Sequence, residues 1–351
     1  MQRFTYAANP VRVIFGSSTL KGLPGEVERL GLSKVLVLST PQQETSAREL
    51  AERIGARAAG VYAGATMHTP VDVTEAAMRV VRDLQVDGLI AVGGGSTTGL
   101  AKAIALRTDL PQIVAPTTYA GSEMTPIVGE TRDGNKVTQS SPKILPEVVI
   151  YDVDLTLSLP VALSVTSGMN AIAHAVEALY ARDANPIVSL MAEEAIAALA
   201  RALPGIVRDP SDQAARSDAL YGAWLCGLCL GAVGMSLHHK LCHTLGGRFN
   251  LPHAETHTAV LPHVLAYNAD AVPDAMVRIN RALGTTEAPG ALFDMAHDLG
   301  AKMALRDLGM PRDGIDVAAD LAVSNPYWNP SELVPNRIRD LLVNAYEGRR
   351  P

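Results

Sequence analysis

The chain has few aromatic residues, few cysteines and no long apolar run, and each scarcity excludes a class of protein. Aromatic residues make up 4% of the 351 residues. The three cysteines, Cys226, Cys229 and Cys242, form no framework of spacings, so disulfides are not expected and a reducing compartment fits. No stretch reaches the roughly 18 uncharged apolar residues that a membrane helix needs. The first residues lack the apolar core of a signal peptide, so we expect a cytoplasmic protein.

An excess of basic residues is also missing. The chain carries 30 Lys and Arg against 36 Asp and Glu, and its formal net charge is -6. Because phosphate-backbone binding needs a concentrated basic surface, a nucleic-acid partner is not expected, and neither is a membrane. Apolar residues make up 48% and charged residues 19%, which is enough for packed cores and argues against disorder. A small-molecule ligand is the partner that this composition leaves.

The first half of the chain alternates short apolar runs with helical patterns. Strands are predicted at residues 12–15, 34–38, 60–62, 88–92 and 112–115, and helices at residues 20–30, 45–54 and 71–84. Strands that are buried on both faces read as continuous apolar runs, and their alternation with helices indicates a parallel sheet. Residues 1–157 are therefore predicted to form an α/β dinucleotide-binding domain.

The second half is predicted to be all-helical. Helices are expected at residues 169–181, 189–202, 214–231 and 294–308, and no strand is expected after Ser164. Cys226-x-x-Cys229 has redox spacing, but it lies in an apolar run that is typical of a buried helix, so packing is the preferred interpretation. Residues 158–351 are predicted to form a substrate and active-site domain.

A glycine-rich segment, residues 93–99, follows one predicted strand directly and opens a helical pattern. Glycines let backbone N–H groups approach phosphate oxygens, and a helix N-terminus adds partial positive charge. Ser96 and Thr97 are expected to cap the helix. Lys102 is expected either to reach a cofactor phosphate or to be exposed to solvent. A plain tight turn is the alternative. The candidate cofactor-binding residues here are Gly93, Gly94, Gly95, Ser96, Thr97 and Lys102.

A second polar loop, residues 116–123, follows the next predicted strand. Loops at the carboxyl ends of parallel strands are where ligands bind, so Thr117, Thr118 and Ser122 are candidates for cofactor contacts and Tyr119 for a substrate contact. An ordinary polar connection is the alternative. No acidic residue follows the strand at 34–38, where an acid would hold the adenosine ribose and repel a 2′-phosphate. Both NADH and NADPH are therefore expected to be accepted.

Histidines recur at helical spacing in the second half. Asn170 and His174 are four residues apart on one predicted helix, and His239 and His243 repeat that spacing on another. His253 is expected in the loop beyond Gly246 and Gly247. One Asp and three His facing one point would form an ordinary divalent metal site, but Asn170 fills the position of the Asp. No such spacing argument applies to His238, His257 and His263, which are interpreted as structural or peripheral.

At these residues the sequence resembles the iron-containing alcohol dehydrogenase superfamily across nearly the whole chain. The resemblance rests on the loops at 93–102 and 116–123, on the helix at 167–178, and on His239-x-x-x-His243 with Pro252-His253. Two departures are informative. Gly99 stands where the superfamily usually has Asp, and Asn170 stands where it has a metal-binding Asp. These departures, with residues 121–126, resemble the branch whose members reduce maleylacetate to 3-oxoadipate in the catabolism of resorcinol and chloroaromatics.

The resemblance implies a dehydroquinate-synthase-like architecture of two domains, a homodimer, and reduction with NADH or NADPH. His243 is the preferred acid or proton relay, while His174, His239 and His253 would bind the carboxylates or enolate oxygen of the substrate. Because a neutral amide removes one negative charge from a dication site, we expect no tightly bound metal and only a vestigial site. Substrate contacts are further expected from Asn170, Tyr119, Lys240 and Tyr327.

Three other functions remain open on the sequence. A metal-dependent alcohol or polyol dehydrogenase of the same superfamily requires Asn170 to serve as a neutral ligand. A dehydroquinate-synthase-like lyase would use bound NAD without net oxidation of the cofactor. A nucleotide-binding sensor would bind the cofactor without turnover, but the dense histidine cluster disfavours it.

Overall fold

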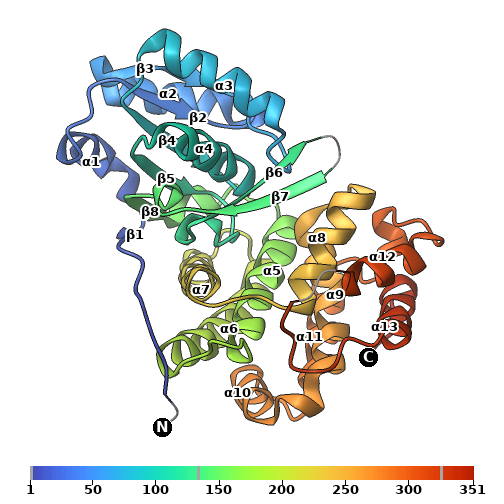
Figure 1. Cartoon of the computed structure of the whole chain (residues 1–351). Helices are drawn as coiled ribbons and strands as arrows, with labels where there is room; N and C mark the ends of the chain where they lie inside the picture. The colour runs from blue at the N-terminus through green and yellow to red at the C-terminus, as the bar shows by residue number, and fades with distance from the viewer. Residues whose placement is uncertain (1–2, 133–134, 325–326) are drawn as a thin grey trace. The chain divides into compact units, whose positions relative to one another are not determined.

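The computed structural model describes residues 3–132, 135–324 and 327–351, which fall into two units. One unit consists of residues 8–159, and the other of residues 1–7 and 160–351 (Figure 1). The sequence predicts a boundary at 157/158, and the division between the units lies at 159/160. Residues 3–7 group with the helical unit, and the sequence analysis did not predict this.

Six parallel strands form the sheet of the first unit. Their spatial order is β1 (Arg12–Gly16), β8 (Val148–Asp152), β5 (Gln112–Pro116), β4 (Gly88–Gly93), β2 (Val35–Leu38) and β3 (Ala58–Tyr62). All residues of β2, β4, β5 and β8 are buried, because these apolar runs are covered on both faces. The predicted parallel α/β fold is confirmed, although the prediction did not include β8.

Four α-helices accompany this sheet: α1 (Leu23–Arg29), α2 (Glu44–Ile54), α3 (Val71–Leu84) and α4 (Gly95–Thr108). The predicted helix at 20–30 is wrong in its first turn, which is a 3₁₀ turn at Thr19–Gly22. Pro24 explains the break, since a proline lacks the amide hydrogen of an interior helical residue and suits the first turn of α1.

An antiparallel hairpin, β6 (Ile127–Arg132) with β7 (Asn135–Ser140), stands apart from the sheet (Figure 1). The sequence analysis did not predict it. Val128 and Glu130 are buried while Gly129 and Thr131, on the opposite face, are half-buried, so the strand has the alternating burial of a two-faced ribbon rather than a continuous apolar run.

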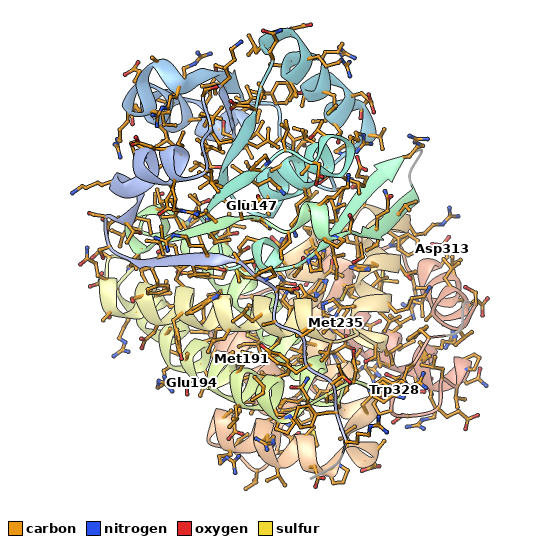
Figure 2. The ribbon with its side chains drawn as sticks, turned by 60° about the vertical axis from the view of Figure 1, so that its left-hand side comes forward. Glu147, Met191, Glu194, Met235, Asp313 and Trp328 are labelled. Atoms are coloured by element: carbon orange, nitrogen blue, oxygen red, sulfur yellow. The ribbon has the colours of Figure 1, made fainter. Side chains whose placement is uncertain are left out.

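The second unit is built from helices, and its described residues from Pro160 onward contain no strand, as the sequence predicts. The helices are α5 (Val161–Leu179), α6 (Pro186–Arg208), α7 (Gln213–Ala232), α8 (Leu237–Phe249), α9 (His253–Asn268), α10 (Pro273–Leu283), α11 (Ala288–Asp298), α12 (Gly314–Val323) and α13 (Pro335–Glu347). On α6, Glu194 is exposed while the two following residues are buried, as expected of a helix with one face on the core (Figure 2).

Two predictions about this unit are wrong. The helix expected at 294–308 ends at Asp298, because Gly300 takes a positive φ of 86° that ends the turn. His253 does not lie in a loop but is the first residue of α9, and Gly246 and Gly247 lie within α8.

The burial expected of the cysteines is confirmed. Cys226 and Cys229 lie on α7 and have no exposed surface, and Cys242 on α8 is 2% exposed. Burial raises the pKa of the Cys226 thiol well above its usual range, so it is an inert packing group rather than a reactive thiol.

Within the described residues, no single helix is long and apolar enough to span a membrane. The pair α7 and α8 reaches the required length and composition together, but its axis bends by 97° at the break.

Candidate active site

The glycine loop joins the carboxyl end of β4 to α4 in the first unit. Gly93 ends the strand, Gly94 is the N-cap of α4, and the helix starts at Gly95. A Cβ atom on Gly93 would lie 2.3 Å from Thr97 Oγ1, and one on Gly94 would lie 2.8 Å from Thr118 Cγ2. Both positions therefore need glycine. They bring backbone against the start of a helix, where unsatisfied N–H groups favour anions, and this cradle fits a cofactor phosphate.

The expected caps of this helix are wrong. Gly94, not Ser96 or Thr97, precedes the first turn, and no side chain caps it. Thr97 is fully buried and its Oγ1 atom has no hydrogen-bond partner within the described chain. The predicted contacts of Ser96 and Thr97 with a cofactor remain predictions.

Gly99 is packed too closely for the aspartate that the resemblance leads one to expect there. A Cβ atom on Gly99 would lie 2.4 Å from Thr69 Oγ1. Thr69 is 5% exposed and has a positive φ of 46°, and its carbonyl accepts a hydrogen bond from Thr131 N–H at 3.2 Å. The threonine therefore occupies the space that a side chain at position 99 would need.

Lys102 anchors the second loop. It has no exposed surface, and its Nζ contacts Ser122 O, Thr125 O at 2.7 Å, Thr125 Oγ1 at 2.9 Å and Ile127 O at 3.0 Å. Burial lowers the pKa of Lys102 to about 7, with the nearby Glu123 carboxylate opposing the shift. The expectation of an exposed lysine is wrong, and these four oxygens occupy the ammonium hydrogens that a phosphate contact would use.

The two candidate loops lie side by side at the carboxyl edge of the sheet. Thr117 N–H donates to Gly93 O at 3.0 Å, and the Gln43 amide donates to Thr117 Oγ1 at 3.2 Å. Thr118 packs beside Gly94, since a Cβ atom on Gly94 would lie 2.8 Å from Thr118 Cγ2. Ser122 is half-buried, whereas Tyr119 has no exposed surface. The sequence thus placed the cofactor candidates at one edge, and their contacts remain predictions.

Three helices of the second unit bring six imidazoles together. His174 comes from α5, His238, His239 and His243 come from α8, and His253 and His257 come from α9. Ring centroids are 5.0 Å apart for His174 and His239, 6.1 Å for His239 and His243, and 6.4 Å for His243 and His253. The four histidines singled out by the sequence therefore lie together, while their roles remain predictions. His243 and His253 are half-buried, and the other four are buried.

Glu177 on α5 organises this cluster, and the sequence analysis missed it. The carboxylate accepts Ser236 N–H at 3.0 Å, Ser236 O–H at 2.8 Å, His238 N–H at 2.8 Å and the His239 Nδ1 hydrogen at 2.7 Å. Burial alone would raise the pKa of Glu177, but the hydrogen bonds from the His239 ring and from the Ser236 backbone oppose it, and the pKa is lowered to about 2. Its spacing of three residues from His174 was the available signal.

From His239 the hydrogen bonds continue into α5. His239 Nε2 lies 2.8 Å from His174 Nδ1, and His174 Nε2 lies 3.4 Å from Asn170 Nδ2. Asn170 is 4% exposed, and its Oδ1 atom has no hydrogen-bond partner among the described residues. Asn170 is thus held at the end of a chain that starts at Glu177.

His238 and His257 form a second pair that the sequence analysis had interpreted as structural or peripheral. His238 Nε2 lies 3.0 Å from His257 Nδ1 and 3.7 Å from Cys242 Sγ. Burial lowers the pKa of His238 to about 3 and that of His257 well below its usual range, so both rings are neutral near pH 7. The signal for this pair was helical spacing, since His257 follows His253 by four residues and Cys242 follows His238 by four.

His238, Cys242 and His257 could form a metal site by distance. Among the described residues they are the one group of three or more potential ligands whose ligating atoms all lie within 4.8 Å of one another. A metal bound between the facing nitrogens would leave the hydrogens on His238 Nδ1 and His257 Nε2 buried, and neither atom has a partner in the described structure. Because ligating imidazoles normally donate their other hydrogen to an acceptor, this group is a poor metal site.

The residues that the resemblance assigns to iron, Asn170, His174, His239 and His253, also fit a metal poorly. The facing nitrogens of His174 and His239 share one hydrogen at 2.8 Å, so they cannot both offer a lone pair to a cation. The fourth position carries a neutral amide instead of a carboxylate, and its nitrogen faces His174. As arranged, Asn170, His174 and His239 face one another rather than a common ion.

Lys240 and Tyr327 lie together. The ammonium of Lys240 is 5.8 Å from the centroid of the Tyr327 ring, which is the geometry of a cation–π contact. The tyrosine ring packs against the core formed by α8, α9, α12 and α13. The structure thus pairs two residues that were predicted separately, and their contact with substrate remains a prediction.

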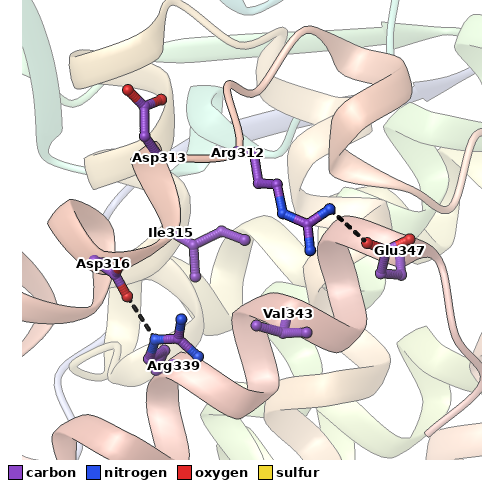
Figure 3. Close-up of a pocket in the computed structure, with 7 residues that line it drawn as sticks. All are labelled: Arg312, Asp313, Ile315, Asp316, Arg339, Val343 and Glu347. Carbon is purple, nitrogen blue, oxygen red and sulfur yellow. Dashed lines mark hydrogen bonds and ion pairs between the residues drawn. The ribbon is translucent and has the colours of Figure 1, made fainter.

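A pocket of about 500 Å³ lies elsewhere in this unit, where α12 faces α13 (Figure 3). Arg339 pairs with Asp316 at 2.5 Å, and Arg312 lies 3.9 Å from Glu347. No imidazole, thiol or hydroxyl lines it. Since Arg312 pairs with Glu347, Arg339 pairs with Asp316, and no imidazole or thiol is present, this pocket is not the candidate site.

Comparison with known proteins agrees with this geometry. Family models described as the iron-containing alcohol dehydrogenase and as the C-terminal domain of that family match residues 10–153 and 164–346. The chain is 56% identical to a maleylacetate reductase of Rhizobium sp. (strain MTP-10005) over 100% of both chains. It is 57% identical to one of Sphingobium indicum over 99% of each chain. The crystal structure of maleylacetate reductase from Agrobacterium tumefaciens matches with a TM-score of 0.96 at 56% identity, covering 100% of both chains.

Proposed function

The chain belongs to the iron-containing alcohol dehydrogenase family, and from this premise we propose that it reduces the carbon–carbon double bond of maleylacetate to give 3-oxoadipate, using NADH or NADPH. The proposal is carried by one observation, the end-to-end similarity to proteins named for this reaction, at 56% identity with every residue of both chains aligned. The histidine cluster, with Asn170 beside it, supports the proposal because imidazoles can bind anions and exchange protons.

The chemistry asks two things of the protein. When bound, the reduced nicotinamide supplies the hydride, which adds to the alkene carbon remote from the ketone and leaves an enolate. The protein must then stabilise negative charge on oxygen and deliver a proton to carbon. Imidazole N–H groups can do both, as hydrogen-bond donors and as general acids. His243 is the proposed acid, and it is half-buried, as a group that exchanges protons with solvent must be.

The cofactor is proposed to rest on the glycine loop. Gly93, Gly94 and the start of α4 form a cradle that side chains at the two glycines would close. Thr117 and Thr118 lie in the adjacent loop, residues 116–123. No carboxylate follows β2, since the next residues are Ser39, Thr40 and Pro41. Acceptance of both NADH and NADPH is therefore proposed. A preference above roughly a hundredfold in kcat/KM, about 2.7 kcal/mol, would contradict it.

Weak or no dependence on a divalent metal is part of the proposal. It rests on the neutral amide of Asn170 and on the hydrogen bond that joins His174 to His239. Activity is measured after exhaustive chelation and again after iron or zinc is added, with metal content determined in parallel. Loss on chelation and recovery with metal would reject this part of the proposal and favour a metal-dependent alcohol or polyol dehydrogenase.

The central test is the decay of NADH absorbance at 340 nm with maleylacetate, compared with simple aldehydes and with alcohol plus NAD. Rapid decay with maleylacetate and little with aldehydes is expected. The reverse order would favour the alcohol dehydrogenase, and product formation without net NADH oxidation would favour a lyase. A reducing, cytoplasmic compartment is also proposed, supported by three buried thiols that form no disulfide. A homodimer is proposed as well. Its oligomeric state is checked by light scattering.

A further inference from the structure

Glu177 terminates a hydrogen-bond chain whose direction is set at both ends. Its carboxylate is approached by three backbone N–H groups, those of Ser236, His238 and His239, and by the Ser236 hydroxyl. Backbone N–H groups can only donate, so the carboxylate is an acceptor throughout. The hydrogen between Glu177 and His239 therefore sits on His239 Nδ1, at an N···O distance of 2.7 Å.

The other end of the chain has the same direction. The amide nitrogen of Asn170 faces His174 Nε2 at 3.4 Å, and an amide nitrogen can only donate. His174 Nε2 must then present a lone pair, so His174 carries its hydrogen on Nδ1. That hydrogen points at His239 Nε2 across 2.8 Å, where His239 has its own lone pair. Each donor in the sequence Asn170, His174, His239, Glu177 thus meets one acceptor, with both imidazoles neutral.

We propose that Glu177 is a positioning residue of the reaction: it fixes His174 and His239 as neutral Nδ1–H tautomers, whose hydrogens are committed within the chain. Neither imidazole then has a hydrogen to give to the substrate. Delivery of the proton falls to the half-buried His243 or His253. This inference rests on the proposed function, and it narrows the roles that the sequence suggested for His174 and His239.

Glu177 also holds the N-terminal turn of α8. Through Ser236, the N-cap of α8, and through the backbone of His238 it holds the first turn of the helix that carries His239 and His243. A negative charge at a helix N-terminus is favourable. Loss of the carboxylate would therefore change two things, the tautomers and the start of α8, and the experiment must separate them.

The variants are Glu177→Gln, Glu177→Asp and Ser236→Ala. Glu177→Gln keeps the size of the side chain but turns an N–H₂ group toward donors, so kcat with maleylacetate is expected to fall about tenfold to a hundredfold. KM for NADH is expected to stay within about twofold, because the glycine loop is unchanged. Glu177→Asp keeps the charge and is expected to recover part of kcat. Ser236→Ala removes the hydroxyl contact to Oε1 and leaves the Oε2 bond to His239, so its kcat should stay within about threefold.

The direct readout is the imidazole ¹⁵N spectrum of histidine-labelled wild-type protein, in which Nδ1–H and Nε2–H tautomers have distinct nitrogen shifts. Two histidines, assigned by His174→Gln and His239→Gln, are expected as Nδ1–H tautomers. Doubly protonated or Nε2–H rings at these positions, or an unchanged kcat in folded Glu177→Gln, would overturn the proposal. The spectrum needs no turnover, so it tests this inference even if Glu177→Gln does not fold or maleylacetate is not the substrate.

Discussion

The glycine loop and the histidine cluster place their functional groups by different means. In the loop, the groups that matter are consecutive in sequence and lie at one strand-to-helix turn. In the cluster, imidazoles from three helices spanning 84 positions, from His174 to His257, are oriented by hydrogen bonds. A site built from consecutive residues can therefore be recognised in the sequence. For a site assembled from several helices, the sequence indicates which residues take part but not which residues hydrogen-bond to one another.

The first prediction concerns the cluster and has the largest expected effect. His243→Asn is expected to lower kcat for maleylacetate about 10² to 10⁴-fold, because a positioned general acid contributes on that scale. The measurement is steady-state NADH oxidation. His263→Asn is the matched control, since His263 lies on α9, packs beside Phe293 and should leave kcat within a few fold. Equal losses in both variants would mean that the cluster works through packing alone.

The second prediction concerns the loop. Gly94→Val is expected to raise KM for NADH by roughly tenfold to a hundredfold, about 1.4–2.7 kcal/mol, since its Cβ would lie 2.8 Å from Thr118 Cγ2. Gly25→Val is the control, because Gly25 lies on α1, outside the glycine loop, and a Cβ atom there would meet no atom within 4 Å. Fluorescence titration of NADH binding checks both. Equal affinities would show that the cradle does not bind the cofactor.

The third prediction tests whether Thr69 is the residue that requires glycine at position 99 of the loop. Gly99→Asp is expected to lower the free energy of unfolding by about 1–3 kcal/mol, because its Cβ would lie 2.4 Å from Thr69 Oγ1. Adding Thr69→Ala should recover part of that loss, measured by urea unfolding of both single variants and the double variant. Strict additivity would mean that the two positions are not coupled.

The fourth prediction concerns pH and a buried histidine, and its effect per pH unit is the smallest. Burial lowers the pKa of His263 to about 4. Between pH 6.5 and pH 4 the unfolded chain therefore binds one more proton than the folded chain at this residue, so the free energy of unfolding falls as pH falls through this window. His263→Asn should reduce that slope by at most about 1.4 kcal/mol per pH unit.

The control for the fourth prediction is His297→Asn, because the side chain of His297 is 68% exposed. Urea unfolding between pH 7 and pH 4 gives the slope for each protein. A slope that is the same in wild type and in His263→Asn would show that this ring is not held neutral by the fold.

The sequence predicted most regular elements because their patterns are local. The helix at 71–84 was predicted with its observed bounds, and the strands at 88–92 and 112–115 differ from the observed ones by a single residue. The hairpin at 127–140 and β8 were missed. The hairpin lacks a long apolar run, and its pairing depends on two segments meeting rather than on either one.

The sequence predicted which residue types form the candidate site, but it did not predict the contacts that these residues make. Periodicity placed Asn170 with His174 and His239 with His243, but it gave no weight to Glu177, three residues beyond His174. Lys102 was expected at a phosphate or in solvent, yet it is buried and holds a loop 20 to 25 residues away. A buried charge takes the acceptors that the fold offers, and those belong to other segments.

The sequence by itself determined the α/β and helical halves, the glycine loop, and four histidines with an asparagine where a carboxylate is expected. Only the tertiary structure decided which nitrogen faces which, and hence which imidazoles have a hydrogen to give. The physical reason is that hydrogen-bond direction depends on the partner at each end, and here the partners come from different helices.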